Sequence, residues 1–316
     1  MRKEAALEWE SRWAVPVAMA TFAAVVLMIA SIFVSGVSDS GDAEVLRSID
    51  ANSGSVLLSG LMRAVSFALL AFPLVYLFRA ARARSERVRT QLIGLVVAAP
   101  LFLGLSSGFQ AVAQQEAADE FVAGEAQPTL TQKEAKEDCV EEREDDGNDQ
   151  LVDEYEPAKG EAPLKACETT KREDDAASNA QTDASLTPFA TGLGIAGGLG
   201  FVVALFYSCL WAMRTGLLTR FWGSLGMALG IAALFGLMPF VLLWFLYFGV
   251  LLLDRLPGGR PPAWAAGEEI PWPTPGEKAA AELDPDDGWD EESQVGDDEG
   301  ESGPRRKRKQ RPSDDG

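Results

Sequence analysis

Long apolar runs separated by charged segments constrain this chain more than any motif does. The runs occupy residues 14–36, 55–78, 91–113, 188–213 and 219–254. Inside them, away from their ends, the only charged side chain is Arg63. Because a helix needs about 20 apolar residues to cross the hydrocarbon core of a bilayer, the pattern predicts an all-α fold, a polytopic transmembrane helix bundle.

The last apolar run is too long for a single span. As one helix, residues 219–254 would reach about 50 Å, far beyond a hydrocarbon core of about 30 Å. The segment Gly236-Leu237-Met238-Pro239 contains glycine and proline, which favour a tight turn. We therefore predict two short spans, 219–236 and 238–254, and six spans in total; one long helix is the alternative.

Positive charge predicts how the spans are oriented. The connector 79–89 contains five arginines, and loops rich in Lys and Arg stay in the cytoplasm. This places both termini in the cytoplasm and residues 114–187 outside, in what we expect to be a plasma membrane. A cleaved signal peptide is an alternative interpretation of the first run, but that run exceeds the usual 7–15 apolar residues and no A-x-A site follows.

Two polar regions complete the domain organisation, beside the membrane segments 1–113 and 188–254. Residues 114–187 are acidic and almost free of aromatic residues, so we expect an external loop that is mostly disordered or only locally helical. Residues 255–316 are polar and rich in proline, which predicts a disordered cytoplasmic tail. Within it, Trp264 and Trp272 are expected to rest at the headgroup level.

Charge limits the partners of the chain. The formal net charge of −19 disfavours DNA as a partner, because phosphate binding requires a basic face. The basic run 305–311 is the exception. In a cytoplasmic tail it would contact anionic lipid, with RNA as the alternative; beyond the lipid bilayer, no protein partner can be inferred.

The centre of the acidic loop resembles a degenerate calcium loop of secreted bacterial repeat proteins. Counting from Asp145 as position 1, it supplies Asp149 at position 5, Asp153 at position 9 and Glu156 at position 12, the positions that calcium loops use. Position 3 holds glycine and the usual glycine position holds Gln150. Any Ca²⁺ would therefore bind weakly, and a solvated acidic stretch is the favoured interpretation. No other cofactor is expected.

Two of the three cysteines flank this stretch. Cys139 and Cys167 both fall on the predicted external, oxidising side, so we expect a disulfide between them. Cys209 lies in an apolar run and is expected to be an inert thiol.

Arg63 is the polar candidate inside the membrane. An intramembrane charge is a functional candidate by default, here for binding an anion or another ligand. The favoured alternative is that its long side chain extends to the outer headgroups.

The sequence lacks the residues that the enzyme hypotheses require. Residues 104–108 match G-x-S-x-G, the nucleophile elbow of serine hydrolases. The chain has no histidine and no lysine in an apolar run, so the serine has no base. The absence of histidine also excludes histidine metal sites, and no P-loop motif is present. We expect no enzyme activity.

The glycines of residues 104–108 also belong to a packing pattern. Pairs of glycines spaced four apart occur in three runs and predict close contact between those helices. They are Gly104/Gly108, Gly194/Gly198 and Gly226/Gly230.

Two segments, 212–226 and 258–268, resemble corresponding segments of a group of multi-pass actinobacterial membrane proteins of unknown function. The resemblance implies six spans and carries over no catalytic residue. We therefore expect a non-enzymatic integral membrane protein with a structural, sensory or accessory role. The alternative is a small-molecule transporter or channel without proton coupling, in which Arg63, Gln110 and Tyr207 would line a path.

Overall fold

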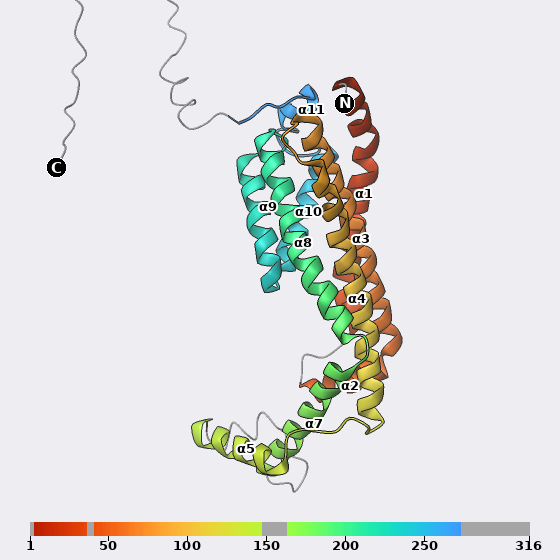
Figure 1. The fold of residues 1–316 in the computed structure, drawn as a ribbon, viewed down its shortest axis with the longest axis vertical. Coiled ribbons are helices and arrows are strands. Elements are labelled where there is room, and N and C mark those ends of the chain that lie inside the picture. The colour runs from red at the N-terminus through yellow and green to blue at the C-terminus, as the bar shows by residue number, and fades with distance from the viewer. Residues whose placement is uncertain (1–2, 37–40, 147–162, 273–316) are drawn as a thin grey trace, which may run out of the picture. The chain divides into compact units, whose positions relative to one another are not determined.

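The computed structural model describes residues 3–36, 41–146 and 163–272, which form helices and connecting turns without any strand (Figure 1). Four helices are long and apolar enough to cross a membrane. They are α1 (Lys3–Ser35), α3 (Ser53–Arg84), α4 (Ile93–Val122, after the 3-10 turn η1, Thr90–Leu92) and α8 (Thr187–Arg214). The predicted all-α class is confirmed, and each of these helices covers one of the first four apolar runs.

Each long helix packs on the next one along the chain. α1 contacts α3, α3 contacts α4 and α4 contacts α8, while the later helix α10 returns to α1. The largest fully buried side chains come mainly from α3, α8 and α10 and form one core. They include Leu70, Leu74, Tyr76, Leu77, Phe78, Phe201, Trp244, Phe245 and Phe248.

Large apolar side chains also cover the outside of the bundle. Phe33 is 80% exposed and Val26 is 63% exposed on α1, and Leu243 is 60% exposed on α10. So many exposed large apolar side chains are unusual for a protein in water. The described helices are therefore compatible with embedding in a membrane.

Glycines set the distance between the central helices. A Cβ added at Gly104 of α4 would lie 2.8 Å from the carbonyl oxygen of Ala64 on α3. A Cβ added at Gly197 of α8 would lie 2.8 Å from the backbone nitrogen of Leu103 on α4. The predicted contact of the glycine-bearing helices is present, although Gly197 makes a close approach that the four-residue spacing does not mark.

The last apolar run is divided into two helices. α9 (Arg220–Ala232) continues through the 3-10 turn η2 (Ala233–Phe235), and α10 (Met238–Leu252) runs back along it. The chain reverses at Gly236, whose φ of +77° favours glycine. Next to this turn, Leu234 lies beside Gly198, since a Cβ added at Gly198 would be 3.5 Å from its side chain. Gly198 is 11 residues, or about 16 Å, into α8.

The acidic loop is not disordered where the structure describes it. It contains the last turns of α4, then α5 (Gln132–Asp146) and α7 (Pro163–Asp183). α7 packs on α2 (Asp42–Ala51), on α4 and on α5. We call α2, the end of α4, α5 and α7 the acidic module. The extent of these helices was not predicted, because the core of the module is built from small residues, which composition averages treat as neutral. These are Ala113, Ala117, Ala118, Ala177, Ala180 and Ala184, packed on Leu46 and Ile49.

The sequence predicts a disordered tail from residue 255, but the structure describes an ordered segment up to residue 272. Residues 254–272, which we call the C-terminal strap, contain the short helix α11 (Pro262–Ala266) and lie across the connector after α8. The indole nitrogens of Trp264 and Trp272 donate to the carbonyl oxygens of Leu217 and Leu218 at 2.9 and 2.8 Å. Trp264 is 5% exposed, so it is a packed residue of the strap and not a headgroup anchor. Residues 305–311 lie outside the described residues.

Candidate functional site

The acidic module is closed by the two predicted cysteines. Cys139 on α5 and Cys167 on α7 are at disulfide distance, with Cα atoms 6.1 Å apart, and both are fully buried. They hold α5 against α7 in a module that has few large apolar side chains of its own. Cys209 is a buried free cysteine in α8, where the sequence places an inert thiol.

Acidic side chains of the module cap backbone amides. Asp174 on α7 accepts a hydrogen bond from the backbone nitrogen of Ala43 at 2.9 Å, at the start of α2. Asp175 accepts from the backbone nitrogens of Leu130 and Thr129, at 2.8 and 2.6 Å, just before α5. Backbone amides would lack a partner here without these carboxylates. The acids of α7 therefore fix the positions of α2 and α5.

These contacts lower the pKa of Asp175. The backbone hydrogen bond from Leu130 is the largest cause, with further contributions from Thr129 and Asn179 that outweigh partial desolvation. The carboxylate form is the one that accepts these bonds. The module is thus held by an ionised aspartate.

A capping box begins α5. The hydroxyl of Thr131 accepts from the backbone nitrogen of Glu134 at 3.3 Å, and the Glu134 carboxylate accepts from the backbone nitrogen of Thr131 at 3.0 Å. The hydroxyl and backbone of Thr131 lower the pKa of Glu134, in that order of size. The pattern T-x-x-E is a sequence signal for a helix start, so this helix could have been found from the sequence.

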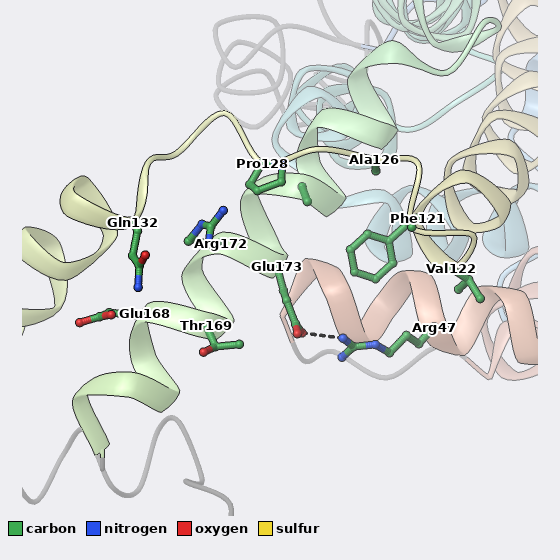
Figure 2. Close-up of a pocket in the computed structure, with 12 residues that line it drawn as sticks. Arg47, Phe121, Val122, Ala126, Pro128, Gln132, Glu168, Thr169, Arg172 and Glu173 are labelled. Carbon is green, nitrogen blue, oxygen red and sulfur yellow. Dashed lines mark hydrogen bonds and ion pairs between the residues drawn. The ribbon is translucent and has the colours of Figure 1, made fainter. Parts of the chain in front are cut away.

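A pocket of about 600 Å³ opens between α2, the end of α4 and α7 (Figure 2). Arg47 and Arg172, the acids Glu168 and Glu173, and the ring of Phe121 line it. Arg47 is occupied, because it pairs with Glu173 at 2.5 Å and lies 5.6 Å from the centre of the Phe121 ring. These positions come from three distant parts of the chain, so no local motif could have revealed the pocket.

Arg172 and Glu168 line this pocket as charges without an ion-pair partner among the described residues. The Nε atom of Arg172 is buried without a hydrogen-bond partner among the described residues. No ion pair joins Arg172 to Glu168 in the described part of the chain, although one turn of α7 separates them. Figure 2 shows Glu168 on the side of α7 where Gln132 lies, while Glu173 points toward Arg47. A buried donor without a partner costs about 1–3 kcal/mol, and an anionic group entering the pocket would remove this cost.

The predicted calcium residues lie mostly outside the part of the chain that the structure describes. Asp149, Asp153 and Glu156 lie outside the described residues, and Asp145 belongs to α5. Among residues 3–36, 41–146 and 163–272, no group of three or more potential metal ligands is found.

Arg63 is half-buried in the first third of α3, and no hydrogen bond or ion pair joins it to another described residue. The residues proposed to share a path with it are placed differently. Tyr207 accepts a hydrogen bond from the backbone nitrogen of Arg89 at 2.9 Å and packs 6.1 Å from Phe78, ring centre to ring centre. Phe78 lies 15 residues beyond Arg63, about 22 Å along α3, and Gln110 is exposed. The structure does not gather the three residues.

The G-x-S-x-G match is part of the helix packing. Residues 104–108 lie in the middle of α4, not at a strand-to-helix turn. The hydroxyl of Ser106 donates to the carbonyl oxygen of Ala190 on α8 at 2.7 Å, and that of Ser107 donates to Leu103 at 2.9 Å. Both serines therefore act as packing residues with satisfied hydroxyls.

The opposite end of the bundle holds a buried ion pair. Arg84, at the end of α3, donates to both carboxylate oxygens of Glu10 on α1, at 2.5 and 2.9 Å, and both side chains are at most 6% exposed. Arg84 also donates to the carbonyl oxygen of Ala263 at 3.0 Å and lies 5.4 Å from the Trp264 ring centre. One arginine of the positive connector thus fastens the C-terminal strap to α1 and α3.

No family model matches this chain, and comparisons with curated proteins and with solved structures find no match.

Proposed function

We propose that this chain is a non-enzymatic multi-pass membrane protein with a sensory or accessory role, whose acidic module recognises a small zwitterionic solute. The observation that carries the proposal is the pair Arg172 and Glu168, two charges without partners in the described structure that line one pocket. Arg172 would take a carboxylate of the solute and Glu168 its ammonium group. The side chain of Phe121 would cover the apolar part of the solute.

The strong negative charge of the module favours this ligand class over a simple anion. Residues 114–187 carry about three acids for each base, so a net anion would be repelled from the surface. A zwitterion has no net charge and avoids this repulsion. Weak Ca²⁺ binding by residues 145–156 stays a second property of the same module to be measured.

A thermal-shift titration tests the recognition proposal. Detergent-purified protein is titrated with amino acids, betaines, simple carboxylates and simple amines. We expect a zwitterion to raise the melting temperature, and the shift to be lost in both Arg172→Gln and Glu168→Gln. Lys136→Gln, on the exposed side of α5, should keep the shift. No response to any zwitterion, or an undiminished response in Arg172→Gln, would refute the proposal.

The proposed arrangement in the membrane keeps both termini cytoplasmic and the acidic module outside a bacterial plasma membrane. The arginines of connector 79–89 and the cysteine pair support this orientation. The basic run 305–311 would then contact anionic lipid of the inner leaflet. The resemblance to multi-pass actinobacterial proteins stays a prediction.

Six membrane segments remain our proposal, with a changed role for α9 and α10. The turn at Gly236 lies beside Gly198, well inside α8, and its neighbours from 231 to 240 are all apolar or glycine. We infer a hairpin that enters and leaves on the cytoplasmic side without reaching the outer surface. The variant Leu237→Cys should resist external thiol reagents, and its labelling in intact cells would favour two complete spans.

The alternative function is transport without proton coupling. The absence of a partner for half-buried Arg63 in the described structure favours it. Solute flux in reconstituted vesicles, compared between the native chain and Arg63→Leu, tests this role. Flux that depends on Arg63 would rank transport first.

A further inference from the structure

A second hollow lies between α1, α3 and α4, away from the acidic module. This groove, which we call the aromatic groove, has a volume of about 460 Å³. Its walls are apolar apart from one end, with Trp13 from α1, Leu101 from α4, and Ala68, Phe72 and Val75 from α3. Trp13 and Phe72 are 44% and 50% exposed, so the groove opens to the outside of the bundle.

Arg79 stands at the polar end of the aromatic groove. Its guanidinium carbon lies 4.7 Å from the centre of the Trp9 ring, and Trp9 stacks on Tyr76 with ring centres 5.2 Å apart. Arg79 is exposed and forms no ion pair with the other described residues. Stacking on an aromatic face orients the guanidinium plane and leaves its edge donors free for an anion.

The length of the aromatic groove matches one leaflet. Arg79 and Ala68, its limits on α3, are 11 residues apart, which corresponds to about 16 Å of helix. Half of a hydrocarbon core of about 30 Å is about 15 Å. A cation at the interface and an apolar channel one leaflet deep are the two features that a phospholipid requires.

We propose that the aromatic groove binds an anionic phospholipid of the inner leaflet, with one acyl chain along α3 and the phosphate on Arg79. The proposal rests on the membrane embedding proposed above but not on the solute pocket. It is separate from the contact expected of residues 305–311, because the cation belongs to α3. The bound lipid would fill the gap between α1 and α4 that side chains leave open.

Spin-labelled lipids test the site. The full chain is reconstituted in phosphatidylcholine vesicles with trace phosphatidylglycerol or phosphatidylcholine labelled on the acyl chain, and electron paramagnetic resonance gives the immobilised fraction of each. We expect about fivefold stronger association of phosphatidylglycerol, the factor that one cation contributes near an anionic lipid. Arg79→Gln should bring the ratio close to one.

Two variants separate this site from general charge effects. Arg214→Gln removes another exposed arginine stacked on a tryptophan, Trp211 at 5.4 Å, and should keep the fivefold ratio. Ala68→Leu narrows the aromatic groove with Arg79 intact and should lower the ratio.

The outcomes distinguish the site from the embedding. A phosphatidylglycerol-to-phosphatidylcholine association ratio of one in the native chain, or a ratio unchanged by Arg79→Gln, would overturn the lipid site. Equal immobilisation of both lipids would still support the membrane embedding. Immobilisation of neither lipid would overturn both.

Discussion

Loss of the buried ion pair between Glu10 and Arg84 should release the C-terminal strap. Both side chains are at most 6% exposed, and Arg84 also donates to a backbone carbonyl of the strap. Removing one partner of a buried pair leaves the other charge uncompensated and costs about 3–5 kcal/mol. We therefore expect either Arg84→Met or Glu10→Gln to lower the free energy of opening the strap by about 3–5 kcal/mol.

Hydrogen exchange of the strap measures this effect. Because 1.4 kcal/mol corresponds to a factor of ten, the amides of residues 263–270 should exchange about one hundred to a few thousand times faster in either variant. The combined variant Arg84→Met with Glu10→Leu removes both charges and should recover most of the protection. Arg214→Met, which removes an exposed arginine without an ion pair in the described structure, is the control. Unchanged protection in both single variants would show that the ion pair does not hold the strap in place.

Three further predictions concern the acidic module and the helix contacts. Cys139→Ser should destabilise the module by about 3–4 kcal/mol in the chain-entropy model, since 28 residues separate the cysteines. The disulfide itself is checked on gels, where the reduced and non-reduced native chain should differ in mobility and the variant should not. Equal mobility of the reduced and non-reduced native chain counts against the bond. Asp175→Asn should lower the free energy of unfolding by about 1 kcal/mol at neutral pH. Because folding lowers the pKa of Asp175, its contribution to stability is present above the unfolded pKa near 4 and is lost as pH falls through the folded value. Chemical denaturation should therefore show a stability difference between the native chain and the variant at pH 7 that shrinks at pH 3, and a pH-independent difference would contradict this prediction. Gly197→Ala should lower the free energy of unfolding by about 1–3 kcal/mol, because the added Cβ would meet the backbone of α4. Gly192→Ala is the matched control, since Gly192 has open space around it. Equal melting temperatures of the two variants would exclude a close approach of α8 to α4 at Gly197.

The long helices could be predicted from the sequence because apolar length alone decides them. A run of about 20 apolar residues has few alternatives to a membrane helix, and α1, α3, α4 and α8 all cover predicted runs. The turn at Gly236 was also predictable, since glycine and proline punctuate an apolar run. How far the α9–α10 hairpin reaches along α8 was not, because that depends on the contact between Leu234 and Gly198.

The acidic module and the strap could not be predicted from composition. The buried face of α7 consists of alanines such as Ala177 and Ala180, which carry a weak hydropathy signal among many acids. The strap has no helical or strand period, and its order depends on indole bonds to carbonyl groups about 50 residues away. Arg172 and Glu168 could not be identified as pocket residues from the sequence, because the pocket forms only when α2 and the end of α4 pack against α7.

Labelling of single cysteines in intact cells distinguishes the proposed membrane orientation from the inverted one. A membrane-impermeant maleimide is applied to Lys136→Cys, on α5, and to Glu86→Cys, in the positive connector; both positions are exposed. We predict labelling of Lys136→Cys in intact cells and of Glu86→Cys only after permeabilisation. Labelling of Glu86→Cys from outside, with protection of Lys136→Cys, would contradict the proposed topology.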